Sequence, residues 1–492
     1  MKSRMYVALV FGLLVVISAV AAAASGGEEI PVTTSNEQAL ADFMKGQRLL
    51  DVGRPQEANK LFEAAVEKDP AFSYAYFNIA NSAASAQEFK DNLDLAMEHI
   101  EGKSEGERLL FEINRTFLDN DAEKRIKLAK TLVEKYPRSP RAWLTQASMQ
   151  TTLNDIEAAR KSMKRALELD PQMIAANVAL GFSYLFSDPK NFTLSEQFLA
   201  RCVELNPGEA KAYENLGDVH RAMKDLKRAR EYYSQAHEKD PTLSAASIKM
   251  GHINSFLGNF DEARADYDAG IAGAKEQNKA NYANYRAFTH LHAGNVQAAL
   301  TELGQIVNSI DGIDIPNDQK RSAKIFTLTN QATIALHHNL LDDAERILMR
   351  RAAVIRASAE RVGDQDFARQ QEANIFLFEG QLAARKGDYQ TARAKAEKNR
   401  ALLEADSNPR KFEGYLGLLG LVELLQGNSE KAVEHYRKAN LTVMYVKYHL
   451  ALALEGAGQT YEAKQLFKEV AEWNFNSVGF ALVRKDALAK IA

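Results

Sequence analysis

Small and apolar residues recur along the chain with the spacing of paired amphipathic helices. Within residues 210–241, the spacing i, i+3, i+4, i+7 that marks one helix face is carried by Tyr213, Leu216, Gly217 and His220. A second helix face is indicated by Ala229, Tyr233 and Ala236. Between them the chain turns at Lys224-Asp225, and Pro241 ends the second helix. Neither helix buries its apolar face alone, so the pattern predicts helix pairs that stack on their neighbours.

The same pattern returns about every 34 residues. The steps from Pro137 to Pro171 and from Pro207 to Pro241 are both 34 residues. The first position on the buried face of each second helix can be followed at Ala58, Asn92, Arg125, Ala159, Ser195, Ala229, Ala263, Ala299, Ala344, Ala392, Ala432 and Ala463. We therefore predict about twelve units, regular over residues 38–275 and longer and more divergent over residues 276–475.

These residues resemble the tetratricopeptide repeat family. That family's pattern is W-x2-L-G-x2-Y, then alanine, an aromatic residue and proline within 34 residues. The best match lies at residues 210–241, with further matches at 140–171, 39–70 and 244–275, the last without its proline. The resemblance implies an all-α fold, a right-handed superhelical solenoid of about twelve helix-turn-helix repeats.

The first residues have the pattern of an export signal. Lys2 and Arg4 precede an apolar run, Met5–Ala24, that ends in four alanines. We expect a signal peptide over residues 1–24, cleaved after one of these alanines. An uncleaved anchor is the alternative, because the run is just long enough to span a bilayer. An exported protein, periplasmic or extracellular or associated with the cell envelope, is therefore expected.

Two further segments lie outside the repeats. Residues 25–37 have the composition of a short polar linker, and residues 476–492 predict a C-terminal capping helix that begins at Asn476 or Ser477. In that helix we expect Leu482, Leu488 and Ile491 to pack on the last unit. Such a cap covers the end of an open repeat array.

The charge of the chain argues against a nucleic-acid partner, and its cysteine content limits disulfides and metal sites. The chain has 62 Lys and Arg against 65 Asp and Glu, a net charge of −3, and it shows no basic stripe. We therefore expect no nucleic-acid partner. The single cysteine, Cys202, excludes an intramolecular disulfide and thiolate-rich metal sites. Because Cys202 takes a small position on a second helix, a buried structural thiol is expected.

Motifs for catalysis or cofactor binding are absent from the sequence. It contains no HExxH, no phosphate-binding GxxxxGK[ST], no GxSxG and no GxGxxG. The spacing of His290 with His292, and of His337 with His338, places each pair on different sides of a helix. These histidines are expected to contact helix-end carbonyls rather than a metal. We therefore expect no catalytic residue, no cofactor, no metal and no enzyme activity.

The resemblance implies a place for a ligand. In the family, the first helices line the concave face, where peptides bind. Carried over position by position, that face is lined here by Asn78, Asn81, Arg141, Thr145, Lys211, Asn215, Asp218, Arg221, Lys249 and His252. Amides can hold a peptide backbone, and lysine and arginine can hold its carboxylates. The alternative is that these residues are only the polar inner surface of a solenoid.

The family's carboxylate clamp is absent, because no lysine occupies its position in the regular units. Phe77, Phe182 and Phe256 near the inner face indicate an apolar component in the ligand. We therefore predict a non-catalytic, exported scaffold or adaptor that binds a peptide or protein. Alternatives are a structural part of an envelope assembly or export machine, and more remotely a regulatory part of an enzyme system. Membrane association would come through an uncleaved N-terminal segment or an envelope complex.

Overall fold

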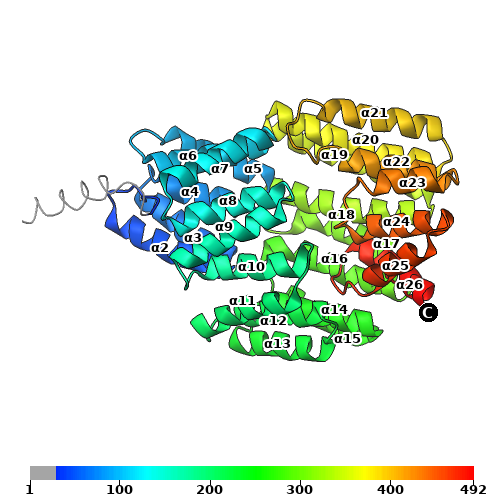
Figure 1. The fold of residues 1–492 in the computed structure, drawn as a ribbon, viewed down its shortest axis with the longest axis horizontal. Coiled ribbons are helices and arrows are strands. Elements are labelled where there is room, and N and C mark those ends of the chain that lie inside the picture. Colours follow the sequence, from blue (N-terminus) through cyan, green and yellow to red (C-terminus); the bar gives the residue numbers. More distant parts are fainter. Residues whose placement is uncertain (1–28) are drawn as a thin grey trace, which may run out of the picture. The chain divides into compact units, whose positions relative to one another are not determined.

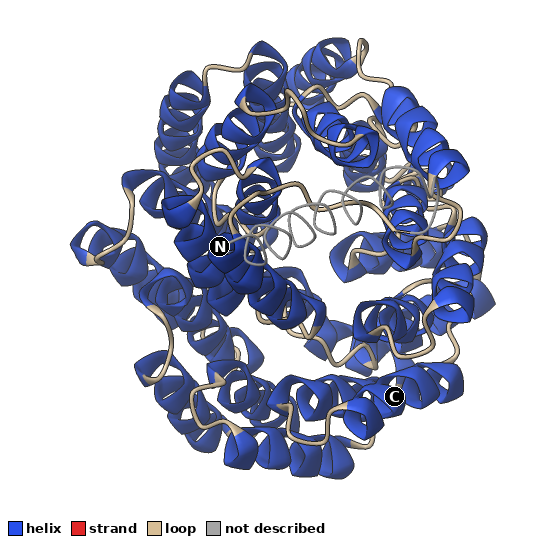
Figure 2. Cartoon of the chain, turned by 90° about the vertical axis from the view of Figure 1, so that its left-hand side faces the viewer, coloured by secondary structure: helices blue, strands red, loops and turns tan. Residues whose placement is uncertain are grey.

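A computed structural model describes residues 29–492 of the chain. Throughout these residues the regular structure is helical and no strand occurs (Figure 1, Figure 2). The predicted signal peptide, residues 1–24, lies outside the described residues. The predicted all-α fold class is confirmed.

Within residues 29–492, the helices follow one another as twelve pairs and a final single helix. The first helices of the pairs are α2 (Glu37–Asp51), α4 (Ser73–Asn81), α6 (Glu105–Leu118), α8 (Pro140–Thr152), α10 (Ile174–Phe186), α12 (Ala210–Ala222), α14 (Ser244–Leu257), α16 (Glu276–His292), α18 (Asn317–His337), α20 (Gln365–Arg385), α22 (Glu413–Leu425) and α24 (Met444–Gly456). The second helices are α3 (Pro55–Lys68), α5 (Ala86–Glu98), α7 (Ala122–Lys135), α9 (Ile156–Leu169), α11 (Phe192–Leu205), α13 (Leu226–Lys239), α15 (Phe260–Ala272), α17 (Val296–Ser309), α19 (Leu341–Val362), α21 (Tyr389–Leu403), α23 (Ser429–Tyr436) and α25 (Thr460–Ala471). The last helix is α26 (Val478–Ile491), and a short 3-10 turn η1 (Ile310–Gly312) follows α17.

Each predicted second-helix position lies in its own second helix, in chain order from α3 to α25. Nine of the twelve are alanines, among them Ala58 and Ala229, and all nine are buried. Asn92, which breaks the alanine pattern, is only partly buried. A small residue here lets the two helices of a pair approach closely, which is why the pattern predicted the pairs correctly.

The pair α12–α13 shows how local sequence builds one unit. Lys224 takes the left-handed backbone conformation, with φ of 69°, and so ends the first helix. The carboxylate of Asp225 then accepts a hydrogen bond from the Arg228 amide at 3.0 Å and caps α13. The predicted turn at Lys224-Asp225 is confirmed.

Contacts divide the chain into two compact units, each described here by itself. The first holds the described residues up to Ser82 together with 91–117 and 121–188, and the second holds Pro189–Ala492 with residues 83–90 and 118–120. In the first unit, residues 29–36 lie against the helices, since the Thr33 hydroxyl donates to Glu107 at 2.6 Å and Ile30 is buried. The predicted division of the repeats at residue 275 stays a prediction.

In the second unit, the C-terminal helices pack back on helices from the middle of the chain. Helix α26 contacts α16 and α18 as well as α24 and α25 (Figure 1). One apolar core joins Phe288 and Leu291 of α16 to Tyr448 of α24 and Val483 of α26. The second unit is therefore closed on itself through its last helix.

Helix α26 begins as predicted, with the Ser477 hydroxyl accepting from the Phe480 amide at 3.2 Å. The expectation that Leu488 packs inward is wrong, because 39% of its surface is exposed. The buried face carries Phe480, Val483 and Ala487, because α26 packs between several helices rather than only on the last pair.

Candidate functional site

In the second unit, six of the predicted inner-face residues lie together on two neighbouring first helices. Helix α12 carries Lys211, Asn215, Asp218 and Arg221, and α14 carries Lys249 and His252. All but the two lysines are buried, with exposed fractions between 3% and 6%. The spacing of three or four residues aligned them on one face of each helix, as the sequence predicted.

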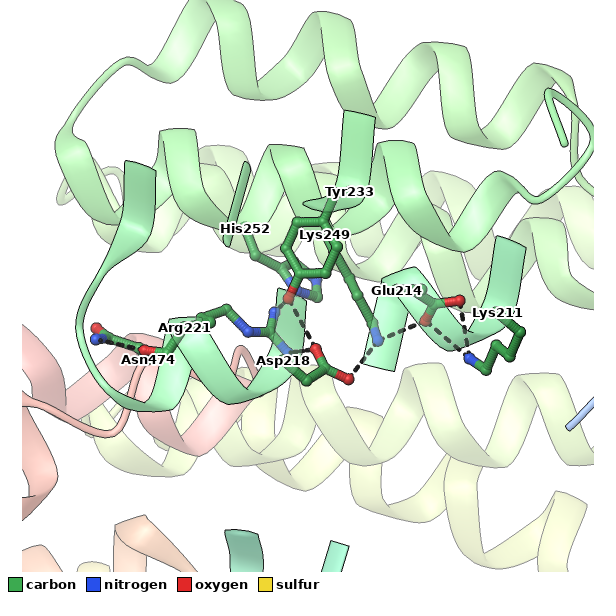
Figure 3. A network of polar contacts seen from close by, with 8 residues as sticks. All are labelled: Lys211, Glu214, Asp218, Arg221, Tyr233, Lys249, His252 and Asn474. Atoms are coloured by element: carbon green, nitrogen blue, oxygen red, sulfur yellow. Dashed lines mark hydrogen bonds and ion pairs between the residues drawn. The ribbon is translucent and has the colours of Figure 1, made fainter. Parts of the chain in front are cut away.

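Five of these side chains and two more from the same helix pairs form one polar network (Figure 3). Lys249 reaches both carboxylates, Glu214 and Asp218, at 2.5 Å, and Lys211 pairs with Glu214 at 2.8 Å. Asp218 also accepts hydrogen bonds from Arg221 and from the Tyr233 hydroxyl, each at 2.8 Å. The network thus holds three cations against two carboxylates in a largely buried place.

The charge states follow from this geometry. Burial opposes ionisation of Glu214 and Asp218, but the neighbouring Lys249 with Lys211 or Arg221 holds the pKa of each carboxyl below its ordinary value. Burial, and then the charges of Arg221 and Lys249, keep the pKa of His252 well below its ordinary value. His252 is therefore neutral, and its Nδ1 lies 2.9 Å from the Arg221 guanidinium as an acceptor.

A segment from the far end of the chain lies over this network. We call residues Glu472–Ser477, which join α25 to α26, the strap. The Asn474 side chain donates to the backbone oxygen of Arg221 at 3.3 Å, and the Phe475 ring centre lies 4.2 Å from the Arg221 guanidinium carbon. The strap therefore covers Arg221, one of the inner-face residues that the sequence suggested for a partner.

The other predicted inner-face residues lie in the first unit and are held by neighbouring side chains. Asn78 donates to Gln47 at 3.1 Å, Asn81 accepts from Asn114 at 2.6 Å, and Thr145 donates to the Arg141 backbone oxygen at 2.9 Å. Arg141 makes a two-point contact with Asp51, at 2.9 and 3.2 Å. Partner binding by any of the ten residues stays a prediction.

A pocket that the sequence did not indicate lies farther along the same series of first helices. Its volume is about 310 Å³. It is formed by first helices of the second unit, α18, α20, α22 and α24, and by the end of α23. The apolar part of its lining comes from Leu336, Leu377, Leu418, Leu421 and Val446.

One cation, Arg385, lies in this apolar lining. Tyr445 and His449 line the pocket with it. Burial raises the pKa of Tyr445, although the positive charge of the nearby Arg385 partly offsets this rise. Burial lowers the pKa of His449 to about 4. Within residues 29–492, Arg385 makes no ion pair with a carboxylate. The carboxylate that lines the same pocket, Glu413, is paired with Arg410.

The sequence held two signals for this pocket. Gly414 and Gly417 are three residues apart on the first helix α22 and line the pocket, where a larger side chain would fill it. Arg385 ends α20 directly after the apolar residues Leu382, Ala383 and Ala384. Neither is specific, because glycines and a terminal arginine occur on many helices.

Three of the four histidines in the two predicted pairs contact side chains. His290 lies 3.0 Å from Glu302, His292 3.2 Å from Asn476, and His337 3.0 Å from Tyr445. The expectation that they contact helix-end carbonyls is therefore wrong for these three. In the part of the chain that is described, no group of three or more His, Cys, Asp or Glu is placed to hold a metal ion.

Cys202 is 2% exposed, and burial raises the pKa of its thiol to about 12, which confirms the predicted buried thiol. From residue 29 to the end, no helix has the length and apolar character needed to cross a membrane.

Known proteins resemble the chain in its repeats. Family models described as tetratricopeptide repeat match residues 43–105, 140–173 and 210–243. Anaphase-promoting complex subunit 3 of Schizosaccharomyces pombe is 21% identical over 349 residues, which are 59% of this chain and 51% of that protein. The chain thus spans about half the length of the curated relative that it matches.

Among solved structures, the chain is similar to one from the APC/C hetero-tetramer Cut9-Hcn1, with a TM-score of 0.39 and 16% identity over 89% of this chain and 78% of that one. It is also similar to yeast Tom70, with a TM-score of 0.38 and 15% identity over 92% of this chain and 95% of that one.

Proposed function

Because this chain is a tetratricopeptide repeat protein, we propose that it is a non-catalytic scaffold that binds a protein partner through a peptide segment. Repeat proteins of this kind present extended surfaces for partners. The observation that carries the proposal is the pocket on the first helices α18, α20, α22 and α24, with Arg385 inside an apolar lining.

The pocket's chemistry defines the segment that it fits. Its volume of about 310 Å³ is small for a ligand site, since such sites range over roughly 300–1,000 Å³. It therefore suits one or two side chains of a longer peptide. Leu377, Leu418 and Leu421 favour an apolar side chain. Arg385 favours a carboxylate beside it, because a half-buried guanidinium without an anion gains most from a charge-assisted hydrogen bond.

The proposal includes the cellular compartment in which the protein acts. The positive residues and apolar run at the N-terminus support export, to the periplasm or the cell exterior. Partners would then belong to the cell envelope or lie outside the cell. Fractionation of cells that make the full chain, with N-terminal sequencing of the exported form, tests this part, and a chain found only in the cytoplasm would contradict it.

Site-specific photo-crosslinking tests the pocket. A photoreactive amino acid replaces Gln381 in the pocket wall, and a matched control carries it at Ala394, which is exposed on the second helix α21. We expect a discrete partner to be crosslinked from position 381 only. Adding Arg385→Gln should reduce that product at least 10-fold, because a hydrogen bond to a charged group contributes roughly 1.5–3 kcal/mol and each 1.4 kcal/mol is a tenfold change in affinity. Equal products from both positions, or none from either, would contradict the pocket as the binding site.

A further inference from the structure

A groove opens between the second helices α19 and α21 of the second unit, above the first helix α20, on which both helices pack. Its volume is about 520 Å³. The apolar part of its lining is nearly buried, with exposed fractions between 6% and 9% for Leu348, Ala352, Leu382 and Ala383. Met349 of α19 also lines the groove and is 64% exposed. A large apolar side chain thus stands in solvent beside an apolar groove that can receive side chains of its size.

Two ion pairs fix the direction in which α19 and α20 run past each other. Lys386, directly after α20, pairs with Glu345 near the start of α19 at 2.7 Å. Glu372, farther back in α20, pairs with Arg356 farther along α19 at 2.6 Å. The two helices are therefore antiparallel, and Glu345 and Arg356 mark opposite ends of the groove. They are eleven positions apart, which is a rise of about 16 Å along α19.

The net charge of the lining changes sign along the groove. The first end carries two carboxylates and one cation, and the second carries two cations and one carboxylate: Glu345, Asp388 and Lys386, then Arg356, Lys395 and Glu379. Lys395 and Glu379 belong toward the second end, because each is seven positions, about 10 Å of helix, from its neighbour at the first end. A surface that is negative at one end and positive at the other matches a second copy of itself turned end for end.

The residues that α19 contributes to the groove have the same symmetry. Turned end for end about the point between residues 350 and 351, the set maps onto itself in the pairs Glu345–Arg356, Leu348–Ala353 and Met349–Ala352. The outer pair joins opposite charges, and each of the two inner pairs joins a large apolar residue to an alanine. Two α19 helices laid antiparallel therefore place each large side chain opposite a small one and each charge opposite its counterpart.

From this self-complementarity we propose that α19 carries a homodimer interface, in which two copies of the chain pair through antiparallel α19 helices. In a two-fold interface the same surface meets itself, so that residue i contacts residue j and residue j contacts residue i. Met349 of each copy lies on Ala352 of the other, where the small alanine lets the helices approach closely. Glu345 of each copy meets Arg356 of the other, which joins two exposed and individually weak ion pairs into one network. Arg385 does not line this groove, so the interface is independent of the peptide pocket.

Charge exchange tests the pairing. Sedimentation equilibrium of the purified chain, from low micromolar to a few hundred micromolar, should show a monomer–dimer equilibrium. Glu345→Arg and Arg356→Glu each set like charges opposite one another, so each should weaken the homodimer at least 10-fold. A mixture of the two variants should form a heterodimer within twofold of the natural affinity, because opposite charges then face each other at both contacts. Failure of the mixture to recover would contradict the assigned pairs.

An exposed methionine elsewhere provides a matched control for the apolar contact. Met349→Glu should weaken the dimer at least 10-fold, because it places a charge against Ala352 of the second copy. Met223→Glu, at the end of α12 and 41% exposed, should leave the dimer affinity within twofold. Both variants should melt as the natural chain does, since both side chains are exposed. Equal dimer affinity in the two variants would place the dimer contact elsewhere than on α19.

Disulfide trapping tests the antiparallel direction. Chains with Glu345→Cys and chains with Arg356→Cys are mixed and oxidised, and we expect a covalent dimer from the mixture. Each variant alone should give none, because identical positions lie about 16 Å apart along the helices and a disulfide needs Cα atoms within about 7 Å. Cys202 does not interfere, because it is buried. A covalent dimer from one variant alone would contradict the antiparallel arrangement. A chain that stays monomeric at every concentration would overturn the interface and leave the groove to a different partner.

Discussion

Gly217 sets how closely α12 and α13 approach. A Cβ atom at this position would lie 2.3 Å from Cε1 and 2.5 Å from Cδ1 of Tyr233. The Tyr233 ring is fully buried, and its hydroxyl is fixed by a hydrogen bond to Asp218. The ring therefore has little freedom to give way, and only glycine fits here.

A pair of glycine substitutions tests this reading. Gly217→Ala should lower the free energy of unfolding by about 1–3 kcal/mol, because it overpacks the α12–α13 contact. Gly417→Ala in α22 should raise it by about 0.5–1 kcal/mol, since the nearest atom to a new Cβ is 4.0 Å away and alanine favours helix. Chemical denaturation measures both. A Gly217→Ala variant as stable as the natural chain would contradict the predicted register of the repeat.

The helix pairs follow from local sequence, because small residues such as Ala229 and Ala263 mark most of the helix contacts, at nearly constant spacing up to Ala299. The strap and the position of α26 do not follow in that way. Asn474 and Arg221 are 253 residues apart, and a repeat period says nothing about which inner face a distant segment covers. The pocket also escaped the sequence reading, because it depends on the space left between four helices rather than on a motif.

Helix α26 offers a test at the level of one element. Phe480 is fully buried, and its ring packs edge-on against Phe256 of α14 at 5.5 Å between centroids. Phe480→Ala should cost about 3–5 kcal/mol in the free energy of unfolding. Leu488→Ala on the same helix should cost little, because Leu488 is exposed.

The same variant shows whether α26 closes the second unit. Hydrogen exchange in Phe480→Ala should accelerate in α16 as well as in α24, since α26 packs against both. Faster exchange confined to α24–α26 would instead indicate an open array in which the last helix only covers its neighbours.

At the scale of the second unit, buried neutral histidines make stability depend on pH. His252, His292, His337 and His449 lie on four different first helices. Burial is the main cause in each case: it lowers the pKa of His292 and His449 to about 4 and of His337 to about 3, and it holds the pKa of His252 well below its ordinary value. Each of these histidines therefore stays neutral in the folded chain under conditions that protonate it in the unfolded chain.

We expect the second unit to lose stability as the pH falls below about 6.5, the ordinary pKa of histidine. Below that value the unfolded chain binds protons that the folded chain does not. Each histidine therefore lowers the free energy of unfolding by up to about 1.4 kcal/mol per pH unit. Glu214 and Asp218 act in the same direction only below about pH 4.5, because their lowered pKa values leave them ionised above it. Denaturation monitored by Trp473 fluorescence between pH 7.5 and 5 measures how steeply the free energy of unfolding falls with pH. His449→Gln should reduce that slope by the contribution of one histidine. A free energy of unfolding that stays constant over this range would show that these histidines reach solvent in the folded chain, against the closed packing of α16, α18 and α24 that buries them.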